Sequence, residues 1–142
     1  MAGASRTVTI KAPIEKVWSV VTDYEKYPEF LAEQTTVKVK SRTGNVVEAV
    51  FGLKLMMEIK YTLRLTETAP TKMSWTMLEG QMMKSNEGGW TLEAISPTET
   101  RATYSIEVAL KGLVPKSVST GLIDSTLPKT MEAFKARAEK LA

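Results

Sequence analysis

The segment from Thr9 to Leu31 constrains the fold more than any other part of the chain, because a short strand and two short helices follow one another within it. Pro13 fits the first position of a helix, where its missing N–H costs nothing. Apolar side chains then recur at spacings of three and four, which predicts a short amphipathic helix: Ile14, Val17, Trp18 and Val21. Asp23 is a suitable cap for a second helical turn, which Pro28 keeps short.

From residue 37 to residue 110 the pattern changes to the alternation typical of strands. A hairpin turn is predicted at residues 42–45, further turns at 68–71 and 96–98, and a strand start after Gly88-Gly89. The odd positions from 53 to 65 are all apolar, which predicts one long strand: Leu53, Leu55, Met57, Ile59, Tyr61, Leu63 and Leu65. With the N-terminal run there are about seven strands, which predicts an antiparallel sheet with one dry face.

A long amphipathic helix is predicted at the C-terminal end. Apolar residues recur there at spacings of three or four: Ile123, Leu127, Met131, Phe134, Ala138 and Leu141. Pro128 lies within this pattern and is expected to kink the helix or divide it. The sequence therefore predicts a single α+β domain over residues 1–142, in which the long helix lies across the dry face and a ligand cavity opens where sheet and helix separate.

The missing residue types exclude several kinds of chemistry. The chain has no cysteine and no histidine, so it has no thiol nucleophile, no Ser-His-Asp triad and no ordinary zinc or iron ligand set. We expect no metal and no cofactor, and any enzymatic activity would depend on Asp, Glu, Lys, Tyr or bound water. The absence of cysteine makes the cytoplasm the default location.

The charge pattern is that of a mixed surface. The net charge is +3, from 19 basic and 16 acidic residues that are interspersed along the chain. A nucleic-acid partner is therefore not expected. No apolar run reaches the roughly 20 residues that a membrane span needs. Transient contact with a membrane is left open, and a monomer is the favoured state.

Three blocks of sequence resemble the helix-grip superfamily of the SRPBCC type, which includes START-like lipid-transfer domains, polyketide cyclase/dehydratases and coenzyme Q-binding proteins. The blocks are residues 10–31, residues 79–92, and the final helix with Leu127-Pro128 and residues 134–139. The second block is similar to the Gly-Pro-Phe-basic and Gly-x-Trp segment of the family, and departs from it at Gln81 and Met82. The resemblance implies a curved antiparallel sheet that grips the long helix around a cavity for a lipophilic molecule.

Side chains on the inner face of the sheet and on the inner side of the final helix are the candidate ligand contacts. They are Leu55, Met57, Ile59, Tyr61, Trp75, Met77, Trp90, Tyr104, Ile106, Thr120, Ile123, Asp124 and Leu127. The alternative is that these side chains fill an ordinary core. The hydroxyls of Tyr61 and Tyr104 are the best candidates for a hydrogen bond to a polar group of the ligand. Trp18, Tyr27 and Phe30 are expected to close one end of the cavity.

Glu79 is the candidate acid–base residue. It continues the alternation of Met73, Trp75 and Met77, which would aim its carboxylate inward, where burial raises a carboxyl pKa. Gly80 follows directly, so the favoured interpretation is that Glu79 lies at a strand end in water.

Three functions are consistent with these observations. The first is binding or transport of a lipophilic small molecule such as a lipid, quinone or polyketide. The second is a cyclase or dehydratase that uses Glu79, Tyr61 or Tyr104. The third is an interaction module like the ribosome-associated toxins, for which the available cations are interrupted by acidic residues: Lys38, Lys40, Arg42, Lys54, Lys60 and Arg64. The identity of the ligand is not encoded in any of these patterns.

Overall fold

The computed structural model describes residues 2–54, 58–111 and 116–142, with side chains over 3–54, 58–111 and 126–142. The helices are α1 (Ile14–Val21), the short 3₁₀ helix η1 (Tyr24–Glu29) and α2 (Lys116–Leu141). The strands are β1 (Ala2–Ile10), β2 (Gln34–Thr43), β3 (Val46–Lys54), β4 (Glu58–Thr68), β5 (Lys72–Gly80), β6 (Met83–Ser96) and β7 (Glu99–Leu110).

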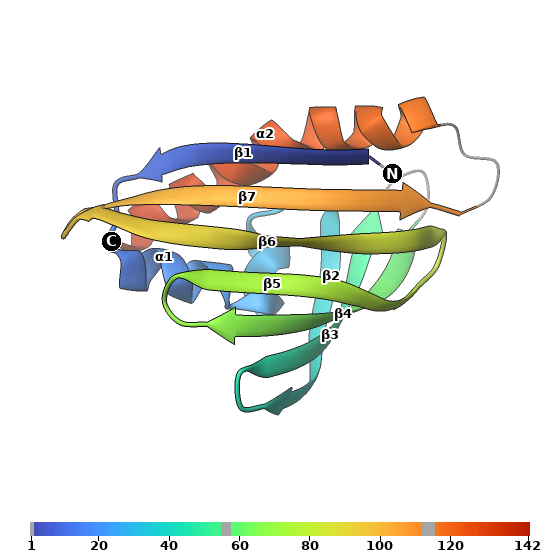
Figure 1. Ribbon diagram of the computed structural model, residues 1–142, viewed down its shortest axis with the longest axis horizontal. Coiled ribbons are helices and arrows are strands. Elements are labelled where there is room, and N and C mark those ends of the chain that lie inside the picture. The colour runs from blue at the N-terminus through green and yellow to red at the C-terminus, as the bar shows by residue number, and fades with distance from the viewer. Residues whose placement is uncertain (1, 55–57, 112–115) are drawn as a thin grey trace.

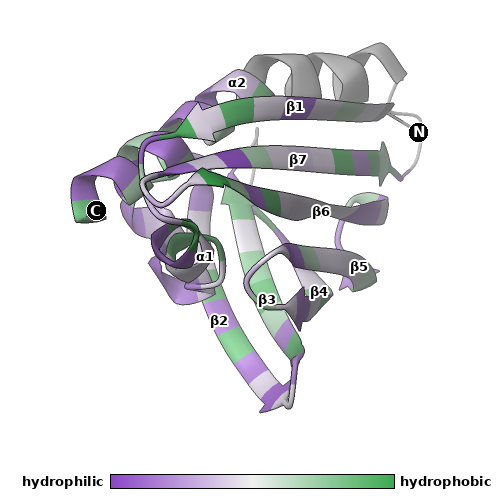
Figure 2. Ribbon diagram, turned by 60° about the vertical axis from the view of Figure 1, so that its left-hand side comes forward, coloured by the Kyte–Doolittle hydropathy of each residue, from purple (hydrophilic) through white to green (hydrophobic). Residues whose placement is uncertain are grey.

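The strands form one antiparallel sheet in the order β1-β7-β6-β5-β4-β3-β2. Strands β2 to β7 are neighbours in chain order, and β1 returns to pair with β7. The sheet is strongly curved, and the helices lie on its concave side, where α2 contacts β1 and β7 while α1 contacts α2 and β6 (Figures 1 and 2). The predicted α+β helix-grip fold is therefore confirmed.

The N-terminal helices are held by a buried apolar face. Val17, Val20 and Val21 of α1 are buried, as are Tyr24 and Tyr27 of η1. Two details differ from the prediction. Pro13 occupies the cap position before α1 rather than its first turn, and the side chain of Asp23 makes no capping hydrogen bond.

The long strand predicted from Leu53 to Leu65 is wrong. Strand β3 ends at Lys54 and β4 begins at Glu58, and residues 55–57 lie outside the described part of the chain. Because Leu53 pairs with Ile59, the odd positions of both strands lie on the same face of the sheet. The apolar alternation therefore continues in phase across the connection, and it conceals the strand boundary.

The glycine pair predicted to start a strand lies inside one. Strand β6 begins at Met83, and Gly88 pairs with both Trp75 and Ile106. A Cβ atom on Gly88 would lie 2.1 Å from the carbonyl oxygen of Ser105. We conclude that glycine is present here because the neighbouring strand approaches too closely for a side chain.

The C-terminal half of α2 is fixed firmly to the rest of the molecule. Leu127, Met131, Phe134 and Ala138 are buried against the sheet and the N-terminal helices. The helix continues through Pro128 as one element, so the expected division at this proline does not occur. This half of the helix closes one end of the fold.

Candidate ligand-binding cavity

A cavity of about 150 Å³ lies between the concave face of the sheet and α2. Its described lining combines the inner face of β3 to β7 with η1, the turn before β2, and α2. The lining residues are Tyr27, Leu31, Glu33, Gln34, Phe51, Leu53, Tyr61, Leu63, Leu65, Met73, Trp75, Met83, Asn86, Trp90, Tyr104, Ile106, Val108, Thr126, Thr130 and Phe134. Leu31, Glu33, Gln34 and Leu53 are only partly buried, and so are Tyr104, Ile106, Thr126 and Thr130 on the other sides of the cavity.

Aromatic rings form the closed end of the cavity. The ring of Phe134 lies edge-on to Trp90 at 4.8 Å and to Tyr27 at 5.3 Å between centroids. The ring of Tyr61 stacks on Phe51 at 5.5 Å. Such contacts fix the rings in place and leave flat apolar surfaces facing the cavity.

Tyr104 supplies a hydroxyl without a protein partner. Its ring packs against Trp90 at 4.9 Å and Trp75 at 5.7 Å. Among the described residues the hydroxyl makes no hydrogen bond. Burial raises the pKa of Tyr104 above its usual value, so the group stays protonated at neutral pH. It can therefore donate a hydrogen bond to a molecule in the cavity.

Tyr61 supplies a second hydroxyl, which is partly satisfied. It contacts the side-chain amide of Gln34, and that amide also donates to the carbonyl oxygen of Gly52 at 2.8 Å. Burial raises the pKa of Tyr61 to about 12, while the hydrogen bond with Gln34 acts in the opposite direction. The Gln34 amide, at the first residue of β2, thus lies beside the Tyr61 hydroxyl.

Two other buried polar side chains of the wall, Trp75 and Asn86, pair with each other. The Trp75 indole Nε1 donates to Asn86 Oδ1 at 3.0 Å, and Asn86 Nδ2 lies 3.9 Å from the sulfur of Met83. These groups have little hydrogen-bonding capacity left. The sheet can therefore offer a ligand the hydroxyls of the two tyrosines and the indole N–H of Trp90, which makes no hydrogen bond among the described residues.

The predicted ligand contacts divide into three groups. Tyr61, Trp75, Trp90, Tyr104 and Ile106 line the cavity. The second group packs in the core or near it and lies outside the cavity lining: Ile59, Met77 and Leu127. The third group lies beyond the described residues or side chains: Leu55, Met57, Thr120, Ile123 and Asp124.

Glu79 is exposed, as the favoured interpretation of its position predicted, and its carboxylate does not point into the cavity. The pairing of β4 with β5 shifts by one residue, because Leu63 pairs with Met77 whereas Thr62 pairs with Glu79. The extra residue is Leu78, and it turns Glu79 onto the outer face beside Thr62. The carboxylate is exposed, with Oε1 3.5 Å from the Thr62 hydroxyl. Glu79 is therefore no candidate for acid–base chemistry in the cavity.

The expected closing group is only partly correct. Tyr27 lines the cavity, whereas Trp18 and Phe30 are absent from its described lining. Phe30 instead supports the closed end from behind, with its ring 5.1 Å from Phe134 and under the guanidinium of Arg137. Gln34 and Asn86 line the cavity and were not among the candidates. Asn86 shares the alternation of Trp90 and was identifiable in principle, but Gln34 follows a turn that no periodicity indicates.

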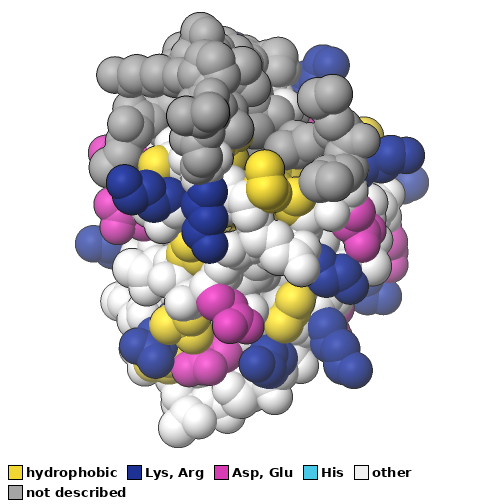
Figure 3. Space-filling view, turned by 90° about the vertical axis from the view of Figure 1, so that its right-hand side faces the viewer, with side chains coloured by type: hydrophobic (Ala, Val, Ile, Leu, Met, Phe, Trp, Pro, Cys, Tyr) yellow, Lys and Arg dark blue, Asp and Glu magenta, His cyan; other side chains and the backbone are white. Residues whose placement is uncertain are grey.

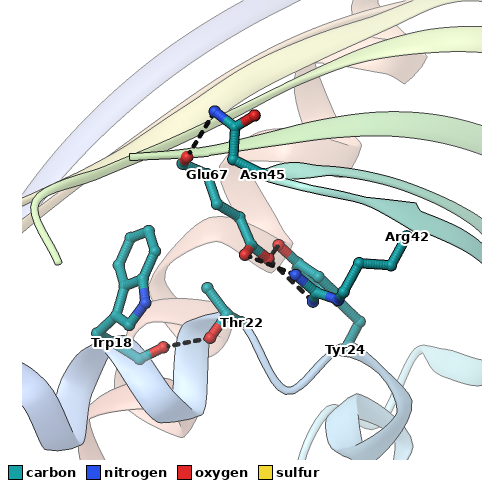
Figure 4. Close-up of polar contacts among 6 residues, drawn as sticks. All are labelled: Trp18, Thr22, Tyr24, Arg42, Asn45 and Glu67. Carbon is teal, nitrogen blue, oxygen red and sulfur yellow. Dashed lines mark hydrogen bonds and ion pairs between the residues drawn. The ribbon is translucent and has the colours of Figure 1, made fainter. Parts of the chain in front are cut away.

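A second polar cluster lies in a corner away from the cavity (Figure 4). The hydroxyl of Tyr24 donates to Glu67 Oε2 at 2.6 Å. Arg42 donates to both oxygens of the same carboxylate, at 3.0 and 3.3 Å. Asn45 Nδ2 donates to the backbone carbonyl of Glu67 at 3.1 Å. This corner joins η1 to the ends of β2, β3 and β4.

The surface carries charges of both signs. At the end where β7 ends and β6 begins, small groups of apolar side chains lie among basic and acidic ones (Figure 3). Within the described part of the chain, no helix is long and apolar enough to cross a membrane. The described residues also bring together no group of three or more potential metal-ligating side chains.

Comparison with known sequences agrees with this geometry. The family model described as polyketide cyclase / dehydrase and lipid transport matches residues 10–135. The chain is 24% identical to the ribosome association toxin RatA of Escherichia coli, over 96% of this chain and 92% of that protein. It is 40% identical to a putative polyketide cyclase of Streptomyces cyaneus, over 33% of this chain and 32% of that protein.

Solved structures are similar over the whole chain. A START superfamily protein from Mycobacterium smegmatis has a TM-score of 0.90 at 20% identity, with 100% of both chains covered. The Zhui aromatase/cyclase from a Streptomyces species has a TM-score of 0.82 at 13% identity, with 97% of this chain and 91% of that chain covered. At these identities the likeness establishes the fold and leaves the chemistry to the cavity itself.

Proposed function

This chain belongs to the polyketide cyclase / dehydrase and lipid transport family, and we propose that it binds or carries a lipophilic small molecule in the cavity between sheet and α2. The observation that carries the proposal is an aromatic cavity into which Tyr104 presents an unpartnered, protonated hydroxyl. No described residue accepts a hydrogen bond from this hydroxyl, so a ligand oxygen in the cavity can accept one. We expect the whole chain, residues 1–142, to act as one cytoplasmic domain.

The size of the cavity limits what it encloses. Its volume of about 150 Å³ is below the roughly 300–1,000 Å³ of sites for drug-sized ligands. It is close to that of an engineered protein cavity that holds benzene. We therefore expect the enclosed part of the ligand to be one ring or a short chain, with the rest of a larger molecule extending past Leu31 and Leu53.

Native mass spectrometry of the purified protein, followed by organic extraction, tests this proposal. A retained compound should be lost in Ile106→Trp, because the larger side chain fills the cavity. The control is Ile95→Trp, since Ile95 is 44% exposed and lies outside the cavity lining. The proposal fails if no compound copurifies and no neutral aromatic or aliphatic probe perturbs the NMR signals of the lining residues.

Catalysis of the cyclase or dehydratase type is a second candidate. The similarity to a putative polyketide cyclase and the two protonated hydroxyls favour it. Because Glu79 is on the outer face, Tyr61 and Tyr104 are the two predicted acid–base residues that line the cavity. Turnover of a polyketone substrate that disappears in Tyr61→Phe or Tyr104→Phe, with binding retained, would support the enzyme over the carrier.

A third candidate follows from the relatives that match along nearly the whole chain. RatA is described as a ribosome association toxin, and the similarity to it covers 96% of this chain. Cosedimentation with purified ribosomes at increasing salt tests such a role. Binding that weakens steeply with salt would favour it over the carrier, and an unbound protein at low salt would exclude it.

A further inference from the structure

The charged groups around the cavity are distributed very unevenly. Among the described lining residues, Glu33 is the only charged one, and none is a lysine or an arginine. Glu33 lies in the turn between η1 and β2. Two backbone hydrogen bonds fix this turn, from Gln34 N to the carbonyl of Leu31 at 3.2 Å and from Lys54 N to the carbonyl of Glu33 at 2.8 Å. A partly exposed carboxylate is therefore held in the cavity lining.

The nearest described lysines are directed elsewhere. Lys54 and Lys60 pair with residues of the neighbouring strand on the outer face, because Leu53 and Ile59 occupy the inner face. The ammonium group of Lys111 donates to the carbonyl oxygen of Gly80 at 3.1 Å.

No arginine is among the described lining residues. Arg6 pairs with Tyr104 across the β1–β7 ladder, but it is exposed and does not line the cavity. An anionic group of a ligand would therefore find no lysine or arginine among the described residues that line the cavity.

The tyrosines offer the complementary chemistry. Tyr104 has a free hydroxyl proton to donate, and the Tyr61 hydroxyl is held by Gln34. A neutral carbonyl oxygen can accept from such donors without bringing a charge into the apolar wall. A carboxylate would lose its hydration there and gain no compensating charge, which is strongly unfavourable.

We infer that the cavity selects neutral ligands that carry a carbonyl-type oxygen, such as a ketone, quinone or ester, over carboxylates, and that Glu33 contributes to this selectivity at the rim. The inference rests on the proposed function and specifies the chemical class of its ligand. It distinguishes this chain from a carrier of free fatty acids, whose carboxylate needs a basic or strongly hydrogen-bonding partner.

A matched pair of small probes tests the inference. Methyl benzoate and benzoate have the same ring and differ in charge, and their binding can be followed by NMR titration of the lining residues at 0.1 M salt. We expect methyl benzoate to bind at least about tenfold more tightly than benzoate. In Glu33→Gln the affinity for benzoate should rise about threefold, because the like charge is removed, while methyl benzoate changes less than about twofold.

Glu58→Gln is the matched control. This substitution removes the same charge from the same end of the sheet. The Glu58 side chain lies on the outer face, outside the cavity lining, where it accepts a hydrogen bond from the Thr35 hydroxyl at 2.7 Å. It should leave the preference for the ester unchanged.

The outcomes separate this inference from the proposed function. If benzoate binds as tightly as the ester, the charge selectivity is overturned and the carrier proposal stands. If Glu33→Gln and Glu58→Gln shift benzoate affinity equally, the role of Glu33 is overturned. If neither probe binds and no compound copurifies, the proposed function fails and this inference fails with it.

Discussion

The four tyrosines of the chain form two pairs in contrasting surroundings. In the closed corner around Glu67, Tyr24 donates to the Glu67 carboxylate at 2.6 Å. Tyr27, which follows in η1, lines the cavity with its ring but donates its hydroxyl to the carbonyl oxygen of Val21. In the cavity, Tyr61 contacts Gln34, and the hydroxyl of Tyr104 has no partner among the described residues. Burial raises the pKa of all four.

The contrast shows that burial alone does not identify a functional tyrosine. What distinguishes Tyr104 from the other three tyrosines is that no described residue satisfies its hydroxyl, whereas Tyr24 and Tyr27 donate to protein oxygens and Tyr61 contacts Gln34. A satisfied hydroxyl contributes to the stability of the fold, whereas an unsatisfied one keeps its hydrogen bond for a ligand. The following predictions test this distinction, ordered by the expected change in the free energy of unfolding.

Alkaline pH should have the largest effect. In the unfolded chain the Tyr61 hydroxyl loses its proton near pH 10, the ordinary value for tyrosine. In the folded protein burial raises this pKa to about 12, so the hydroxyl keeps its proton over that interval. Stability is thus unaffected below about pH 10 and falls as the pH rises toward 12, by about 3 kcal/mol from Tyr61 alone. Urea unfolding at pH 8 to 12, together with absorbance at 295 nm, measures this loss. Ionisation of all four tyrosines near pH 10 in the folded protein would contradict it.

Removal of the acceptor in the closed corner should have the next largest effect. Glu67→Ala leaves the Tyr24 hydroxyl without a partner and Arg42 without its carboxylate. The loss is large because the Glu67 side chain is only 12% exposed, so water replaces these contacts poorly. We expect a loss of about 2–3 kcal/mol in urea unfolding and no change in ligand affinity. Glu48→Ala is the control. Its pairing with Arg64 at 3.4 Å is solvent-exposed, so about 0.5 kcal/mol is expected.

Tyr24→Phe should have a smaller effect in the same corner. It removes one donor from the Glu67 carboxylate, and Arg42 still satisfies both oxygens. The expected loss is about 1 kcal/mol in urea unfolding, with ligand retention unchanged. A loss of ligand in this variant would show that the closed corner and the cavity are coupled.

Tyr104→Phe should have the smallest effect on stability and the largest on binding. No described hydrogen bond is lost, so unfolding should change by less than about 0.5 kcal/mol. Affinity for a carbonyl ligand should fall about five- to tenfold, because its hydrogen-bond donor is removed. Unfolding and binding measured on the same preparation check both values. If Tyr104→Phe destabilises the protein as much as Tyr24→Phe and leaves binding intact, the distinction between Tyr104 and the other tyrosines is wrong.

The alternation of apolar and polar residues in the sequence predicted the inner face of the sheet correctly where two strands pair without a bulge. It placed Tyr61 and Trp90 along the cavity even though the strand from 53 to 65 was wrong, because Leu53 pairs with Ile59. It failed at Glu79, because one extra residue at Leu78 reverses the face. A bulge depends on how two strands pair, and the sequence of one strand does not reveal it.

The polar groups of the cavity were only partly predictable. Tyr61 and Tyr104 follow the alternation, but Gln34 acts through a turn that brings its amide to Gly52 and Tyr61. Such a contact joins separate parts of the chain, and it depends on packing rather than on local periodicity. The family resemblance indicated that a cavity exists, and the side-chain contacts define its chemistry.

The place of β1 at the edge of the sheet has a consequence for the order of folding. Strands β2 to β7 pair with neighbours in the chain, whereas Ile10 pairs with Thr100 and Ala4 with Ile106. Closing so long a loop is slow, and during synthesis β1 has no strand to pair with until β7 has left the ribosome. We therefore expect the amides of β1 to become protected last in pulse-labelling hydrogen exchange. The segment that begins the chain would then complete the sheet.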